Sequence, residues 1–348
     1  MENFSSFERV VGNIHDSVKE IVLHETKEQF RNQNFESLIQ RERQKTPEEL
    51  QILSLANSVT NELRREYGLS DFDIPAENIH IITDKAWGEG KDEQGSFGLY
   101  QPEFQRILLR EQLSNMVFLT IAMHELLHFK SYNALQVIRG GKGKLGVYRS
   151  GLRIQSRDGK TFYLNGIDEA VTEELSQRLI RKFSDHPLFA KEEAQTKKIL
   201  NQYPGALRAP SKTLFTPDVY YAQLKEESKG KKWLKAVGRI FGFKKAIKEE
   251  PDILCQEMAY PQERKIFNTL IDKLYEKNFD QISNREAVFN VFAKAMLTGN
   301  ILPLGRLVDG TFGKGTLWRI GELDHDTQAL EEFVDSLDST VISGITSK

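Results

Sequence analysis

The sequence predicts an α+β fold in which helical regions flank a central part that contains strands. Two short runs rich in β-branched and other apolar residues, at 78–82 and 106–110, are typical of strands. On either side, apolar residues recur at intervals of three and four, which is typical of amphipathic helices. We therefore expect a helical region at 1–70, an α+β domain at 71–185 and a mostly helical region at 186–348.

The composition excludes several classes of protein. Of the 348 residues, 39% are hydrophobic and 28% charged, which is enough apolar material for a folded core. The 48 basic and 50 acidic side chains nearly cancel, so we expect no nucleic-acid partner. The single cysteine, Cys255, rules out an internal disulfide and a cysteine-rich zinc module, so any metal must be held by histidines and carboxylates.

The chain shows no export or membrane signal. Its first residues lack a basic stretch leading into an apolar one, and no run approaches the 18 apolar residues of a membrane helix. We therefore expect a cytoplasmic protein.

The N-terminal region is expected to hold two helices. Valines and isoleucines from Val10 to Val22 form one stripe at helical spacing. Thr46 and Pro47 resemble a helix start, with threonine as the cap and proline in the first turn, and Gly68 is a stop. Residues 71–75 form a linker.

The central domain is expected to continue from strand 78–82 through a glycine-rich loop into strand 106–110. A long helix follows from Ser114 to about Leu135. Residues 147–154 and 161–164 resemble a hairpin that turns at Asp158-Gly159, and a helix should cover 167–183. Further helices are expected at 190–200, 263–277 and 285–297.

Two other segments were considered for binding. Residues 229–248 carry eight basic and no acidic side chains, a pattern that suits either a membrane-surface helix or, as we favour, a helix packed on the domain. The glycine-rich segment 305–315 lacks the Gly-Lys-Ser/Thr ending of a phosphate loop, so we expect no nucleotide there.

The long central helix contains the motif His124-Glu125-Leu126-Leu127-His128. Histidines four residues apart lie on one helix face, so both imidazoles can reach one zinc ion at about 2.0–2.1 Å. Glu125 is offset around the helix, where it can take a proton from a metal-bound water. Random placement of these residue types gives roughly 0.01 matches in a chain of this composition.

A catalytic zinc also needs a third protein ligand and an open position for water. The metzincin continuation is missing, because Ser131 and Ala134 stand where glycine and histidine are required. The helix after the hairpin offers Glu169 and Glu173, again four apart, so that one could bind the ion while the other accepts a hydrogen bond from a ligand histidine. The alternatives for the third ligand are Asp168, Glu174 and His186.

With these residues the chain resembles the gluzincin group of zinc metallopeptidases over about residues 78–183. The resemblance implies a zincin-like fold, with a small mixed sheet over the active-site helix. It also implies His124, His128 and Glu169 as zinc ligands, Glu125 as general base and Glu173 as the acid behind a ligand. Two departures are Asp168, where the family often has asparagine, and the segment 140–164, which would be an inserted hairpin.

The resemblance implies hydrolysis of peptide bonds in a peptide or protein substrate. Strand 106–110 could be the edge strand that pairs with extended substrate. Side chains that could stabilise the tetrahedral oxyanion are, by type, Tyr148, Arg149, Tyr163 and Tyr260. The alternative is a zinc-binding or regulatory protein that keeps such a site without catalysis.

Overall fold

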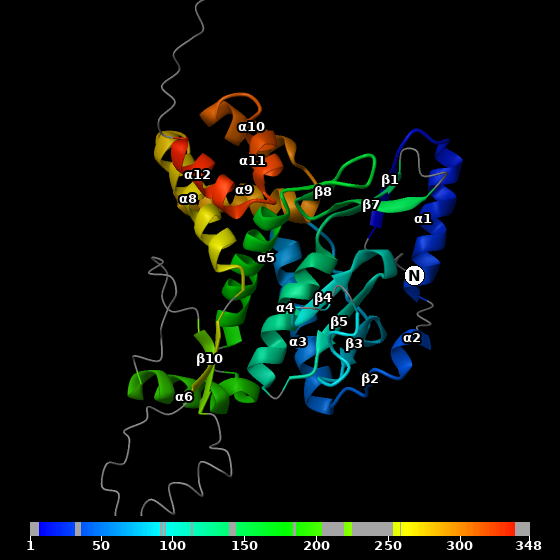
Figure 1. Ribbon diagram of the computed structural model, residues 1–348, viewed down its shortest axis with the longest axis vertical. Coiled ribbons are helices and arrows are strands. Elements are labelled where there is room, and N and C mark those ends of the chain that lie inside the picture. Colours follow the sequence, from blue (N-terminus) through cyan, green and yellow to red (C-terminus); the bar gives the residue numbers. More distant parts are fainter. Residues whose placement is uncertain are drawn as a thin grey trace, which may run out of the picture. The chain divides into compact units, whose positions relative to one another are not determined.

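The structure is a computed structural model that describes residues 7–31, 36–90, 93, 95–112, 114–138, 144–183, 186–203, 219–224, 253–257 and 259–337. The chain divides into two compact units, Met1–Lys182 with Ala259–Lys348, and Phe183–Met258. Helices and small sheets are both present, as the predicted α+β class requires (Figure 1). Within the described residues, no helix is both long and apolar enough to cross a membrane.

The N-terminal region contains a strand that the helical pattern did not predict. Val10 and its neighbours lie in β1 (Phe7–Val11), and Val10 packs with Phe7, Leu135 and Val147. The helices there are α1 (Asp16–Arg31), α2 (Glu36–Ile39) and α3 (Pro47–Glu66). The predicted start of α3 is confirmed, because Thr46 caps it in a reciprocal capping box.

One sheet has four strands in the order β2-β3-β5-β4. Its strands are β2 (Glu42–Arg43), β3 (Ile79–Ile82), β4 (Gly98–Gln101) and β5 (Arg106–Arg110). β3 is parallel to β5, whereas β4 is antiparallel to it. The strand expected at the edge, 106–110, is therefore interior. The edge strands are β2 and β4, and β4 directly follows the glycine-rich loop.

Helix α4 (Asn115–Lys130) packs against β4 and β5 and lies next to α3. Ser114 caps its start as predicted, since its hydroxyl accepts a hydrogen bond from Val117 N–H. The helix ends before the expected Leu135, because the Asn133 side-chain amide donates to the carbonyls of Phe129 and Ser131. The chain then enters β6 (Asn133–Val137).

A second sheet has the order β1-β6-β7-β8-β9. Its later strands are β7 (Leu145–Ser150), β8 (Arg153–Gln155) and β9 (Phe162–Tyr163). The predicted turn at Asp158-Gly159 joins β8 to β9, but 147–154 is itself a hairpin that reverses at Gly151, whose φ of +60° favours glycine. Helix α5 (Asn165–Ile180) follows and packs on α4.

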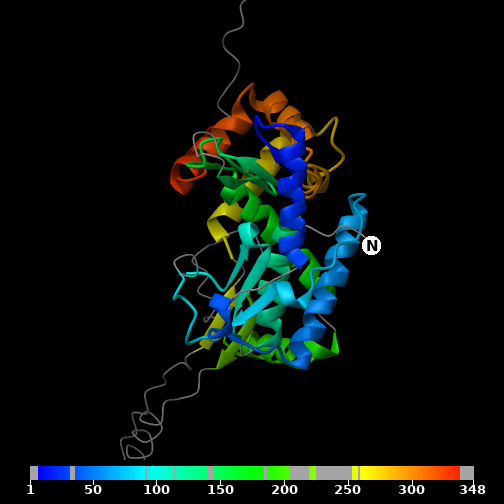
Figure 2. The same cartoon turned by 90° about the vertical axis from the view of Figure 1, so that its right-hand side faces the viewer.

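The helices predicted at 263–277 and 285–297 are present as α8 (Pro261–Lys277) and α9 (Arg285–Thr298). Three further helices were not predicted: α10 (Leu302–Phe312), α11 (Thr316–Leu323) and α12 (Thr327–Ser336). Of these, α10 occupies most of the glycine-rich segment 305–315. Short 3-10 turns lie at Ala76–Asn78, Pro102–Phe104 and Arg181–Phe183. Figure 2 shows the same elements from the side.

The second unit contains α6 (Pro187–Gln202), which packs with β10 (Val219–Leu224). β10 pairs antiparallel with β11 (Ile253–Glu257). The basic segment 229–248 lies outside the described residues.

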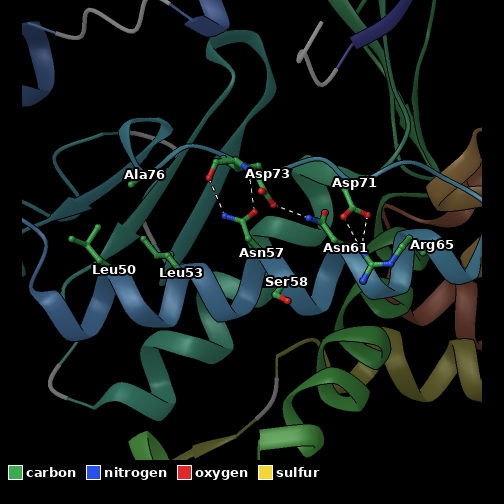
Figure 3. A pocket seen from close by; sticks show the side chains of 11 residues that line it. Leu50, Leu53, Asn57, Ser58, Asn61, Arg65, Asp71, Asp73 and Ala76 are labelled. Carbon is green, nitrogen blue, oxygen red and sulfur yellow. Dashed lines mark hydrogen bonds and ion pairs between the residues drawn. The ribbon is translucent and has the colours of Figure 1, made fainter. Parts of the chain in front are cut away.

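Polar side chains of α3 hold two neighbouring parts of the chain, which are the segment 71–75, shown in Figure 3, and the end of α4. Asn57 exchanges two hydrogen bonds of 3.0 Å with the backbone of Ile74, and Asn61 accepts one from Phe72 N–H. The fully buried ammonium of Lys130, the last residue of α4, donates to the Asn61 side chain at 2.8 Å and to the Asn57 carbonyl at 3.0 Å. These hydrogen bonds therefore hold the linker 71–75 against α3 and fix the C-terminal end of α4 to the same helix.

Candidate metal centre

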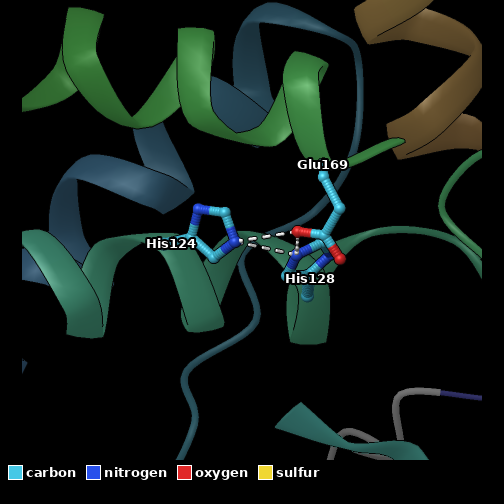
Figure 4. A group of neighbouring side chains, drawn as sticks. All are labelled: His124, His128 and Glu169. Carbon is cyan, nitrogen blue, oxygen red and sulfur yellow. Dashed lines mark hydrogen bonds and ion pairs between the residues drawn. The ribbon is translucent and has the colours of Figure 1, made fainter. Parts of the chain in front are cut away.

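Three predicted residues from two helices converge in the first unit. His124 and His128 project from one face of α4, one turn apart, and Glu169 reaches them from α5 (Figure 4). Each offers a ligand atom, and these atoms lie within 4.8 Å of one another. The two imidazoles are buried, and the Glu169 side chain is 18% exposed. This group could hold a metal ion.

The three nearest atoms form an almost equilateral triangle. The two Nε2 atoms are 3.1 Å apart, and Glu169 Oε2 lies 3.2 Å from Nε2 of His124 and 3.1 Å from Nε2 of His128. Ligands held tetrahedrally at 2.0–2.1 Å from a zinc ion are about 3.3 Å apart. The triangle therefore has the size that one such ion requires, without rearrangement of either helix.

The outer nitrogen of His124 faces Glu173. Nδ1 lies 2.7 Å from Glu173 Oε2, and the other oxygen of this carboxylate accepts a hydrogen bond of 2.7 Å from the backbone N–H of Ala259. Glu173 is 2% exposed. A carboxylate oxygen at this position accepts a hydrogen bond from Nδ1–H of His124, so Nε2 is the nitrogen that would bind an ion.

The outer nitrogen of His128 faces Asp168, a residue considered as a ligand from the sequence. Asp168 Oδ2 lies 3.4 Å from Nδ1 of His128, and Oδ1 accepts a hydrogen bond of 2.6 Å from Leu152 N–H. A Cβ at Gly151 would stand 2.2 Å from that oxygen, so glycine is needed for the approach. Asp168 therefore lies next to Nδ1 of His128, and each of the two imidazoles has a carboxylate on the side away from the triangle.

The other two alternatives for the third ligand have different partners. Glu174 accepts hydrogen bonds from Arg264 and Asn268. His186 belongs to the second unit, where its Nδ1 caps α6 by accepting a hydrogen bond from Leu188 N–H.

Without an ion, the carboxylates govern protonation of the imidazoles. Burial alone would lower the pKa of His128, but Glu169 and Asp168 outweigh it and raise this pKa to about 10. The pKa of His124 is raised well above its usual value, since Glu169 and Glu173 likewise outweigh burial. The pKa of Glu169 falls far below its ordinary range in spite of burial, because both imidazoles stabilise the carboxylate. The two imidazoles and the Glu169 carboxylate can each donate a lone pair to an ion. The carboxylates around the imidazoles favour a positive charge at the centre of the triangle.

The side chain of Glu125 extends from α4 toward the edge strand β4. Its carboxylate accepts a hydrogen bond from the backbone of Tyr100 in β4, and a Cβ at Gly98 would come within 2.7 Å of its Oε1. Glu125 is 7% exposed. Burial raises the pKa of this carboxyl, although the neighbouring imidazoles lower it.

Of the four oxyanion candidates, the structure brings Tyr260 to the triad. Its ring stacks on His124 at 5.7 Å, and its hydroxyl hydrogen-bonds Glu169. Tyr260 has a φ of +55° and precedes α8, so no helical or strand pattern could have placed it. Burial and the surrounding carboxylates raise its pKa, so the hydroxyl keeps its proton.

The other three candidates have roles elsewhere. Arg149 donates to the carbonyls of Gly151, Ala295 and Gly299 and so ties β7 to the end of α9. Tyr163 stacks on Trp318, and the Tyr148 ring lies beneath the Arg157 guanidinium.

Comparison of the chain with protein-family models, with curated proteins and with solved structures found no match. The class that fold and site define is therefore a mixed helix-and-sheet protein with a buried triad of two histidines and a glutamate that could hold a metal ion.

Proposed function

We propose that this protein is a zinc-dependent peptidase of the zincin type. The observation that carries the proposal is the triangle of two Nε2 atoms and one carboxylate oxygen, with each imidazole backed by a buried acid. A structural zinc site is closed by four protein ligands, whereas a catalytic one has three. The described residues supply three.

The donor set favours zinc over the hard cations. Magnesium and calcium prefer an all-oxygen shell, but two of the three donors here are imidazole nitrogens. Zinc bound at this triad would lower the pKa of a water toward about 7 and polarise the scissile carbonyl.

The side chains around the triad suit peptide hydrolysis. Glu125 would take a proton from the attacking water and return it to the leaving amine, and its raised pKa brings it closer to neutral pH, where a general base works best. The Tyr260 hydroxyl would donate a hydrogen bond to the oxygen that becomes negative. The edge strand β4 would pair with an extended substrate through its backbone.

The test measures metal content and peptide cleavage in the same preparations. We expect about one zinc per chain, cleavage of a peptide library that chelation abolishes, and recovery on adding zinc. Glu125→Gln should keep the zinc and lose turnover by at least a thousandfold, whereas Glu62→Gln, a surface carboxylate 3.6 Å from Lys182, should retain both.

Other outcomes would reject the proposal. Stoichiometric zinc without cleavage of any peptide would indicate a metal-binding or regulatory protein. Iron in place of zinc would indicate oxygen chemistry, because two histidines and one carboxylate also serve iron enzymes. Full turnover by Glu125→Gln would remove the proposed base.

A further inference from the structure

Helix α5, which carries three acids of the candidate metal centre, begins without a cap of its own. Leu164 stands at its N-cap position with a φ of +60°, a left-handed conformation, and its side chain makes no hydrogen bond to the helix. The first hydrogen bond of α5 runs from Asp168 N–H to the Leu164 carbonyl. The N–H groups of 165–167 therefore point out of the helix end and need an acceptor from elsewhere.

Asp324 supplies that acceptor from the far end of α11. Its Oδ2 accepts a hydrogen bond of 2.8 Å from Gly166 N–H, and its Oδ1 accepts one of 3.3 Å from Ile167 N–H. Asn165 N–H donates to the same carboxylate. A Cβ at Gly166 would stand 3.0 Å from Asp324 Oδ1, so glycine leaves room for this approach. One carboxylate thus caps all three N–H groups, and its negative charge suits the N-terminal end of a helix.

The packing of α11 determines where Asp324 lies. The ring of Trp318 lies against that of Tyr163 in β9, with the ring centroids 4.7 Å apart. A Cβ at Gly321 would stand 3.3 Å from the Cβ of Tyr163, so the backbone of α11 comes close to the chain just before α5. Asp324 follows the last residue of α11, and these contacts place its carboxylate at the first turn of α5.

Two acids of the metal centre lie at this first turn. Asp168 and Glu169 directly follow the three capped residues. The carboxylate of Asp168 lies next to Nδ1 of His128. Oε2 of Glu169 is 3.2 Å from Nε2 of His124 and 3.1 Å from Nε2 of His128. A first turn that opens would therefore carry both acids away from the imidazoles.

We propose that Asp324 is a positioning residue of the metal centre: by capping α5 it holds Asp168 and Glu169 where they meet the two imidazoles. The inference rests on the metal binding that the proposed function requires, and not on peptide cleavage. A protein in which the first turn of α5 is open part of the time binds an ion more weakly, in proportion to the fraction of molecules with the turn formed. Loss of the cap raises the open fraction, because three N–H groups lose their acceptor.

The experiment measures the zinc affinity of the full-length chain by competition with a fluorescent chelator. Asp324→Ala should bind zinc about tenfold more weakly. Asp324→Asn keeps one acceptor oxygen and should be weakened only about threefold. The matched control is Asp326→Ala, because Asp326 caps α12 by accepting a hydrogen bond of 3.0 Å from Ala329 N–H, and α12 carries no residue of the triad. This control should lose stability too, but keep its zinc affinity within about twofold.

Cobalt in place of zinc provides a readout that a general loss of stability would not change. The visible absorption of bound cobalt depends on the number and geometry of its ligands. If Glu169 is held less firmly in Asp324→Ala, the spectrum of the cobalt-loaded variant should differ from that of the unaltered chain. Asp326→Ala should reproduce the spectrum of the unaltered chain.

The outcomes separate this inference from the proposed function. An unchanged affinity and spectrum in Asp324→Ala, or an equal loss of affinity in Asp326→Ala, overturns the inference and leaves the peptidase standing. If Asp324→Ala does not fold, Asp324→Asn decides by the same measurements: weaker binding with an altered spectrum supports the inference, and unchanged values overturn it. Zinc binding without cleavage of any peptide rejects the proposed function, yet a selective loss in the Asp324 variants still supports the inference. A chain that binds neither metal overturns both.

Discussion

Replacement of Glu173 by glutamine tests whether this acid keeps the proton of His124 on Nδ1, so that Nε2 can bind zinc. Both oxygens of Glu173 act as acceptors, one toward Nδ1 of His124 and one from Ala259 N–H, each at 2.7 Å. Glutamine keeps the shape but offers one acceptor and one donor. One of the two contacts must therefore become an encounter of two donors.

Either arrangement of the amide weakens the site. If the amide nitrogen faces His124, the proton of the imidazole moves to Nε2, which then cannot bind an ion. If it faces Ala259, the backbone N–H of this exposed residue loses its acceptor, at a cost of about 0.5–1.5 kcal/mol. We expect zinc affinity to fall about 10- to 100-fold, which corresponds to about 1.4–2.7 kcal/mol.

Competition with a fluorescent chelator measures the zinc dissociation constant. The matched control is Glu174→Gln on the same helix, whose carboxylate is bound by Arg264 and Asn268 rather than by a ligand histidine. That variant should lose stability but keep its zinc affinity within about threefold. An unchanged affinity in Glu173→Gln, with the control also unchanged, would refute the role assigned to this acid.

Three further results are expected. Zinc affinity should rise with pH, about tenfold per unit for each imidazole that must lose a proton, and level off only near pH 10, because the metal-free pKa of His128 is about 10 and that of His124 is also raised; calorimetry in buffers of different ionisation enthalpy measures the released protons. Gly98→Ala should lower kcat/KM at least tenfold with zinc affinity intact, because the new Cβ would stand 2.5 Å from Ile121 Cγ2 and 2.7 Å from Glu125 Oε1; an unaffected rate would contradict this close approach. Thr46→Ala should lower the free energy of unfolding by about 1 kcal/mol through loss of the capping box, as denaturant titration would show.

Local patterns predicted the elements whose cause is local. Thr46 and Ser114 start helices because their own side chains cap them, and the strand at 79–82 follows from three isoleucines in four residues. Where contacts with distant residues determine the secondary structure, the local spacing of apolar residues gave a wrong prediction. Val10 has helical spacing, but it packs against Leu135 and Val147, more than a hundred residues away, and lies in a strand.

The same division holds for the candidate site. His124 and His128 could be paired from the sequence because one helix fixes their spacing. The acids of the following helix left more than one candidate for the third position, and Glu169 was chosen among them only through the family resemblance. Tyr260 could be proposed only by residue type. Its position depends on where the chain re-enters the first unit, and nothing local determines that.

The distribution of acids along α5 follows from the direction of the helix. His124 faces Glu173 and His128 faces Asp168, so the earlier histidine meets the later acid, and the two helices run antiparallel. At 1.5 Å per residue, the histidines are about 6 Å apart along their helix and the two acids about 7.5 Å along theirs. These lengths agree closely enough for both contacts to form at once, with Glu169 free to turn toward the Nε2 atoms. A parallel α5 would bring Glu173 to the His128 end instead, so the spacing of the acids suits the antiparallel arrangement. The antiparallel register of α4 and α5 is therefore what places one acid at the two Nε2 atoms and one acid at each Nδ1 atom.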